Sequence, residues 1–178
     1  MLDYGWNPNL YGHNDVGLYI VGFVRLLTVS KPQIHPMTVA AASFPPSVVK
    51  ILLDHGVCTR GTMAMHAAAS NAANDPSRFE VLDLLLSFDG DVNEMEVDPK
   101  GRNPPRRRTS FTGTPLHHAI ECDSIESVQY LLQKGASPWA PGWSGENALK
   151  VAERYNRTKI AETIRNLSPP EYSSLSKH

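Results

Sequence analysis

One segment of the sequence recurs, with variations, along most of the chain. Residues 113–119, Gly-Thr-Pro-Leu-His-His-Ala, lead into an amphipathic run that ends at 128–136 with Val-Gln-Tyr-Leu-Leu-Gln-Lys-Gly-Ala. Weaker copies begin at His35, Met63 and Asn147, and a second apolar run follows each of them. A unit of two short helices leaves apolar faces uncovered, so only the stacking of neighbouring units makes a core. The chain is therefore predicted to form a row of helix pairs.

The residue types in each unit indicate where its helices begin and end. Threonine followed by proline starts a helix well, because the hydroxyl caps free N–H groups and proline at the first turn loses no needed donor. The alanine-rich first helix lets neighbouring helices approach closely, whereas leucine and valine in the second helix bury bulk. Gly56 and Gly135 follow second helices, where a left-handed residue is favoured.

Residues 114–119 match the ankyrin signature Thr-Pro-Leu-His-x-Ala at every fixed position. The chain thus resembles the ankyrin-repeat family. The resemblance implies an all-α, ankyrin-like helix-pair solenoid with short finger loops, with about four helix pairs and an N-terminal partial repeat. It implies a protein-binding role, and it implies that His66 and His117 hydrogen-bond the backbone of adjacent loops.

The predicted repeats divide the central part of the chain into residues 35–62, 63–113, 114–146 and 147–167. A partial repeat and an irregular insertion occupy residues 1–34, and a flexible tail occupies residues 168–178. A long finger loop is predicted at about 94–112, with acidic residues in its first half and basic residues in its second half.

An apolar segment, residues 18–27, permits either a strand or a helix, and periodicity cannot decide over so short a run. One hypothesis is that this segment covers the apolar face of the first complete pair as an N-terminal cap. The alternative is that the chain is a fragment, or that its start reflects an imperfect gene model.

Composition and charge argue against several classes of protein. Seventeen lysines and arginines against eighteen acidic residues give a net charge of −1, which disfavours nucleic-acid and membrane-surface partners. Cys58 and Cys122 are too few for a disulfide framework, and we expect reduced thiols in an intracellular protein, cytoplasmic or nuclear. The start lacks a basic region before an apolar stretch, and the longest apolar run, 16–24, is too short to span a membrane.

No catalytic constellation is visible in the sequence. On a helix, the adjacent side chains of His117 and His118 point about 100° apart and cannot easily share a metal. There is no glycine-rich phosphate loop and no nucleophile elbow, and Cys122 has no catalytic motif around it. We predict a non-catalytic protein with no cofactor and no metal.

Trp139 and Trp143 flank Pro141 on the finger between the last two repeats. Tryptophan is enriched at binding hot spots, so both are predicted to anchor a partner protein. The alternative is that each indole packs on a neighbouring finger. The other predicted partner contacts are Glu146, His118 and Glu121.

The long finger contains a basic cluster, Arg106, Arg107 and Arg108, which resembles nuclear-import signals. Ser110 follows it and is a candidate phosphorylation site, because a phosphate there would pair with the arginines and fold the loop back on itself. The alternative is an extended, solvated loop.

The tail contains Pro169, Pro170 and Tyr172 in the pattern Pro-Pro-x-Tyr, which resembles the ligands of WW domains. Two prolines pre-set a polyproline II turn at low entropic cost, and the tyrosine adds an apolar ring for a second pocket. Since WW domains occur on ubiquitin ligases, the alternative function is a regulatory adaptor that recruits such a ligase. The plainer alternative is that the prolines only end the last helix.

Overall fold

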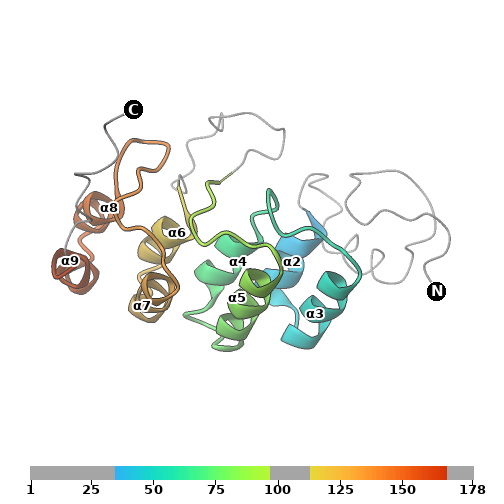
Figure 1. Cartoon of the computed structure of the whole chain (residues 1–178). Coiled ribbons are helices and arrows are strands. Elements are labelled where there is room, and N and C mark those ends of the chain that lie inside the picture. Colours follow the sequence, from blue (N-terminus) through green and yellow to red (C-terminus); the bar gives the residue numbers. More distant parts are fainter. Residues whose placement is uncertain (1–34, 97–112, 168–178) are drawn as a thin grey trace, which may run out of the picture.

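The computed structural model describes residues 35–96 and 113–167, and every regular element in those ranges is an α-helix (Figure 1). The first helices of the four pairs are α2 (Pro36–Ser43), α4 (Ala64–Asn71), α6 (Pro115–Glu121) and α8 (Ala148–Arg154). The second helices are α3 (Pro46–Asp54), α5 (Ser77–Phe88), α7 (Ile125–Gln133) and α9 (Thr158–Arg165). The predicted all-α solenoid of four helix pairs is confirmed.

Several sequence predictions lie outside the described residues. They concern the N-terminal partial repeat, the basic cluster at Arg106, Arg107 and Arg108, the candidate phosphorylation site Ser110, and the tail motif of Pro169, Pro170 and Tyr172. They stay predictions. In the part of the chain that the structure does describe, no helix is both long and apolar enough to cross a bilayer.

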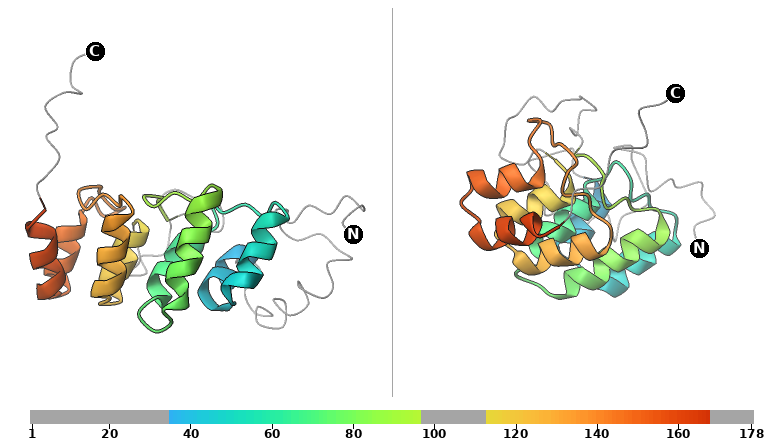
Figure 2. Two further views of the ribbon diagram at one scale, coloured as in Figure 1. Left: turned by 60° about the horizontal axis from the view of Figure 1, so that its bottom comes forward. Right: turned by 60° about the vertical axis from the view of Figure 1, so that its left-hand side comes forward.

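The four pairs stand side by side in a row, which we number as units 1 to 4 along the chain (Figure 2). The first helices pack against one another in sequence, α2 on α4, α4 on α6 and α6 on α8. Small side chains such as Ala40, Ala68 and Ala119 are fully buried there. Leu85 and Leu131 fill the core from the second helices. The division between small and bulky residues thus follows the sequence prediction.

The helix ends use the chemistry that the sequence indicates. Thr114 and His117 form a capping box at the start of α6, in which the histidine Nδ1 accepts a hydrogen bond of 3.1 Å from the Thr114 N–H. In unit 1, the Nδ1 of His35 caps α2 in place of a threonine. Gly56 and Gly135 adopt the left-handed conformation, with φ of 78° and 92°.

Histidine side chains of first helices reach the finger that leads to the next unit. The Nε2 of His66 lies 3.1 Å from the carbonyl oxygen of Gly113, and the Nε2 of His117 lies 3.2 Å from that of Glu146. A carbonyl only accepts, so each Nε2 carries the proton and donates it. We call this contact the carbonyl bridge, and it confirms the expected structural role of both histidines.

Unit 1 makes the same bridge with a different residue. Thr38 stands three residues after the helix cap, as His117 does, and its hydroxyl donates to the carbonyl of Thr62 at the end of the next finger. In unit 4 this position is Lys150, which is exposed. The bridge therefore recurs at each described junction between units.

Arginine side chains of units 2 and 4 bind the unit that precedes them. Arg78, only 1% exposed, donates from Nη1 to the carbonyl of Ala41 at 3.1 Å, and its Nε pairs with Asp75 at 3.0 Å. Arg157 donates in the same way to the carbonyl of Glu121 at 3.2 Å. Both carbonyls lie at the C-terminal end of the preceding first helix, where the helix dipole favours a positive charge.

The outer face of unit 4 is charged. Glu153 and Arg165 stand where unit 3 has Ile120 and Leu132, and they pair across 2.7 Å. Ile120 is fully buried, whereas Glu153 and Arg165 are exposed. Such replacement of interface residues by charges is typical of the terminal unit in a repeat stack.

Replacing His117 with alanine removes both its capping contact and its carbonyl bridge. We expect the free energy of unfolding to fall by about 2 kcal/mol, with about half from each lost interaction. Urea unfolding followed by circular dichroism measures this loss. Lys150→Ala is the matched control at the same repeat position and should change the free energy by less than about 0.5 kcal/mol. Equal effects of the two substitutions would show that the bridge contributes nothing.

Candidate functional site

The fingers between units 2 and 3 and between units 3 and 4 are bound directly to one another. Asn93 donates from its side-chain amide to the carbonyl of Gly135 at 3.3 Å, and its Oδ1 accepts from the N–H of Ser137 at 2.7 Å. Two hydrogen bonds from one side chain fix the relative position of both fingers. The two bonds therefore hold the fingers in one relative arrangement.

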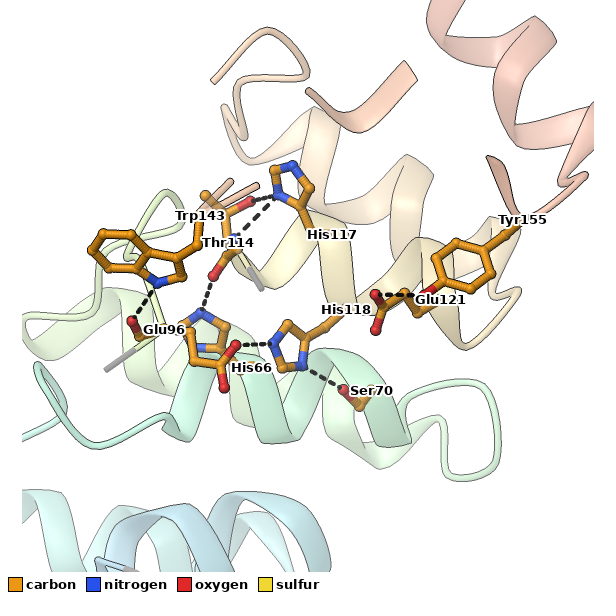
Figure 3. Close-up of polar contacts among 10 residues, drawn as sticks. His66, Ser70, Glu96, Thr114, His117, His118, Glu121, Trp143 and Tyr155 are labelled. Carbon is orange, nitrogen blue, oxygen red and sulfur yellow. Dashed lines mark hydrogen bonds and ion pairs between the residues drawn. The ribbon is translucent and has the colours of Figure 1, made fainter. Parts of the chain in front are cut away.

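Trp143 makes a second connection between these fingers. Its indole N–H donates to the backbone carbonyl of Glu96 at 2.9 Å, and its side chain is half-buried (Figure 3). The N–H of Glu96 in turn donates to the carbonyl of Gly113 at 2.8 Å. This bond joins the two residues that flank segment 97–112 of the long finger. The contact agrees with the alternative interpretation of Trp143, an indole packed on a neighbouring finger. Trp139 is also half-buried, and its role as a partner anchor stays a prediction.

His118 lies inside the stack. Its exposed fraction is 6%, and its ring meets that of His66 edge to face with 4.8 Å between centroids. Its Nδ1 lies 3.5 Å from the hydroxyl of Ser70, and its Nε2 lies 3.6 Å from Oε2 of Glu96 (Figure 3). The predicted partner contact through His118 does not fit this position, because the side chain points toward α4 rather than toward solvent.

Burial controls the charges of this internal cluster. It raises the pKa of Glu96 to about 7 and lowers the pKa of His118 to about 3, and the neighbouring His117 lowers the latter further. Desolvation likewise lowers the pKa of His66 to about 3. Between pH 3 and pH 7 the carboxyl keeps its proton while the imidazole has none. The contact between Glu96 and His118 is therefore a neutral one, and not a salt bridge.

Glu121 and Glu146 lie at the surface beside this cluster. Glu121 is half-buried and accepts a hydrogen bond of 3.3 Å from the hydroxyl of Tyr155 (Figure 3). Burial raises its pKa to about 7. The carboxylate of Glu146 pairs with Arg154 at 3.1 Å, and 31% of its side chain is exposed. Both residues can exchange a contact within the chain for one with a partner, and the prediction that they do so stays open.

The bridging histidines are engaged within the stack. His66 and His117 use their Nε2 protons for carbonyl bridges, so neither ring is placed as a general base toward solvent. Within residues 35–96 and 113–167, no group of three or more His, Cys, Asp or Glu side chains is placed to hold a metal ion.

Comparison with known families agrees with this geometry. Residues 37–141, more than half of the chain, match the family model described as ankyrin repeats, three copies. The chain belongs to the ankyrin-repeat family. Ankyrin repeats mediate binding to other proteins, and the family is generally non-catalytic. A search of curated proteins finds no match. The match ends in the finger after unit 3, and the helix pair of unit 4 continues the ankyrin stack beyond it.

Sequence reasoning missed the residues that join the fingers. Asn93 lies in the long finger, and the sequence shows only a polar residue among acidic ones. Glu96 belongs to the acidic half of the predicted long finger, whereas 85% of its side chain is buried. Arg78 looks like an ordinary polar residue at a helix start. Each of these roles depends on contacts with residues that are distant in the sequence, so no local sequence pattern predicts it.

Glu96→Gln should change how stability depends on pH. The folded protein holds the Glu96 proton up to about pH 7 and the unfolded chain only to about 4.5, so stability is lost as the pH rises through this window. Glutamine has no proton to lose. Relative to the wild type, the variant should therefore gain unfolding free energy between about pH 5 and about pH 8.

Urea unfolding at several pH values tests this expectation. His66 and His118 act in the opposite direction on acidification, but they contribute equally to both proteins and cancel in the difference. Glu80→Gln, at an exposed site on α5, is the control and should give a difference that stays flat with pH. A flat difference for Glu96→Gln as well would show that its carboxyl is not desolvated.

Proposed function

We propose that this ankyrin-repeat chain is a non-catalytic scaffold that binds a partner protein on the fingers and first helices of units 3 and 4. The observation that carries the proposal is the fixed relation of the two fingers. Asn93 and Trp143 join one finger to the other, and His117 holds the second finger against α6. A surface ordered in advance loses little conformational entropy on binding, so more of the contact energy appears as affinity.

The exposed groups beside these fingers suggest how a partner would be recognised. Glu146 and Arg154 form a partly exposed ion pair, and Trp139 offers a half-buried aromatic side chain in the same finger as Glu146. A few aromatic and charged anchors usually supply most of the binding energy of an interface. We propose Trp139, Glu146 and Glu121 as those anchors, with Trp143 as the support beneath them.

We also propose that the protein acts inside the cell, in the cytoplasm or the nucleus. Cys58 and Cys122 are exposed thiols that are not joined to each other, and such thiols persist in a reducing compartment. A cell lysate is therefore the appropriate source of partners for the test of the scaffold.

Reversing the charge of Glu146 should impair capture of the partner. Immobilised full-length protein and its Glu146→Lys variant are incubated with lysate, and the bound proteins are quantified by mass spectrometry. At least one protein captured by the wild type should fall by about tenfold or more, as expected for loss of one interface anchor. The melting temperature should stay close to that of the wild type, because a surface ion pair contributes little stability.

Glu126→Lys is the matched control for this experiment. Glu126 is exposed on the second helix α7, away from the fingers, and its substitution makes the same change in charge. The control should retain the captured proteins. Equal losses for both variants, or no loss for either, would count against binding at the fingers.

A second proposed function is that of an adaptor for a ubiquitin ligase with WW domains. The sequence Pro169, Pro170, Glu171 and Tyr172 supports it, since the motif supplies the two prolines and the tyrosine that an aromatic-lined groove accepts. In this proposal the stack holds a client while the segment after α9 engages the ligase.

A labelled peptide spanning residues 165–178, titrated against a panel of WW domains, tests the motif directly. Binding by at least one domain should weaken by about tenfold or more in the Tyr172→Ala peptide, because the aromatic ring fills a pocket of its own. If no domain distinguishes the two peptides, the adaptor proposal fails while the scaffold proposal is unaffected.

A further inference from the structure

The second helices of units 1, 2 and 3 can be aligned by the hydrogen bond that closes each of them. The three bonds are Val57 N–H to Leu52 at 3.1 Å, Gly90 N–H to Leu85 at 2.9 Å, and Ala136 N–H to Leu131 at 2.9 Å. The residue just before each accepting leucine therefore occupies one repeat position. That position holds Ile51, Leu84 and Tyr130.

In unit 3, this position faces the preceding unit. The ring of Tyr130 lies 4.8 Å from that of Phe79 in unit 2, and its hydroxyl donates to the Phe79 carbonyl at 3.1 Å. Leu84 in unit 2 is partly buried against the core. Ile51 in unit 1 is 50% exposed. The side chain that would pack on a preceding unit is thus present in unit 1, while the described residues contain no unit before it.

The charged side chains in the two helices of unit 1 all lie on α3. Helix α2 contains no charged residue. On α3, Lys50 and Asp54 pair with each other at 2.7 Å. At the other end of the stack, Glu153 and Arg165 replace the apolar interface residues. Unit 1 therefore keeps an uncharged α2 and an exposed Ile51, which a repeat stack normally covers, beside the ion pair of Lys50 and Asp54.

The preceding part of the chain contains a segment of matching chemistry. Residues 18–27 are Leu-Tyr-Ile-Val-Gly-Phe-Val-Arg-Leu-Leu, with Arg25 as the only charged side chain. The roughly eight residues from Leu27 to His35 reach up to about 27 Å when extended. Packed helices lie about 8–10 Å apart, so this connection is long enough. A short tether also keeps the segment at an effective concentration of about millimolar.

We propose that residues 18–27 pack on the face of unit 1 that carries Ile51, in the place that a preceding unit occupies elsewhere in the stack. The segment serves as a cap that is not itself a helix-pair repeat. A second copy of the chain is the competing occupant of this face, and the experiment distinguishes the two.

Photo-crosslinking in the full chain tests the contact. A benzoylphenylalanine replaces Ile51, and the cross-linked peptides are identified by mass spectrometry in a mixture of light and heavy isotope-labelled chains. Cross-links to residues 18–27 of the same chain are expected. The same probe at Arg165, exposed on the opposite outer face, should give none to that segment. Cross-links between light and heavy chains, or none to residues 18–27, would refute the proposal.

A substitution within the segment gives an independent readout. Ile20→Asp in the full chain should increase amide hydrogen exchange in α2 and α3 by about tenfold or more, because a buried charge is incompatible with packing on an apolar face. Exchange in α8 and α9 should not change. Unchanged exchange in α2 and α3 would mean that the segment does not cover them.

Discussion

The carbonyl bridge from a first helix to the next finger is the interaction on which the arrangement of this protein depends. A unit of two short helices has too little core to be stable alone, so its neighbours must be held in register. The side chains of Thr38, His66 and His117 supply that register, because each reaches the finger that leads into the next unit. His117 makes both a helix cap and an inter-unit contact. Its Nδ1 caps α6, and its Nε2 binds the carbonyl of the next finger.

The same bridges decide what the surface can do. The fingers are fixed to the helices and to one another. Some residues that the sequence predicts as partner contacts therefore lie inside this framework, whereas others are partly exposed to solvent. Trp143 joins the fingers through its hydrogen bond to a backbone carbonyl, and His118 is buried inside the stack. Glu146 and Glu121 are partly exposed to solvent. The hydrogen bonds among the fingers thus hold the proposed binding surface in one arrangement.

The helix pairs were predictable from the sequence because their signals are local. A cap, a proline and the alanine or leucine content lie within one unit, and the motif at residues 114–119 specifies the bridging histidine. The internal position of His118 was not predictable, since it depends on which face of α6 meets α4 and on the buried Glu96 from a long insertion. Asn93 and Arg78 act across units, so their roles require the relative placement of elements that the sequence does not encode locally.

The imidazole nitrogens of His66 and His117 test the central claim most directly. Two-dimensional NMR of the ¹⁵N-labelled protein distinguishes a protonated ring nitrogen from an unprotonated one. We expect both rings to carry their proton on Nε2 and to take up a second proton only below the ordinary imidazole pKa, because each donates to a carbonyl in a buried site, and burial lowers the pKa of both. Rings that take up a proton near pH 6.5, or that carry their proton on Nδ1, would contradict the account.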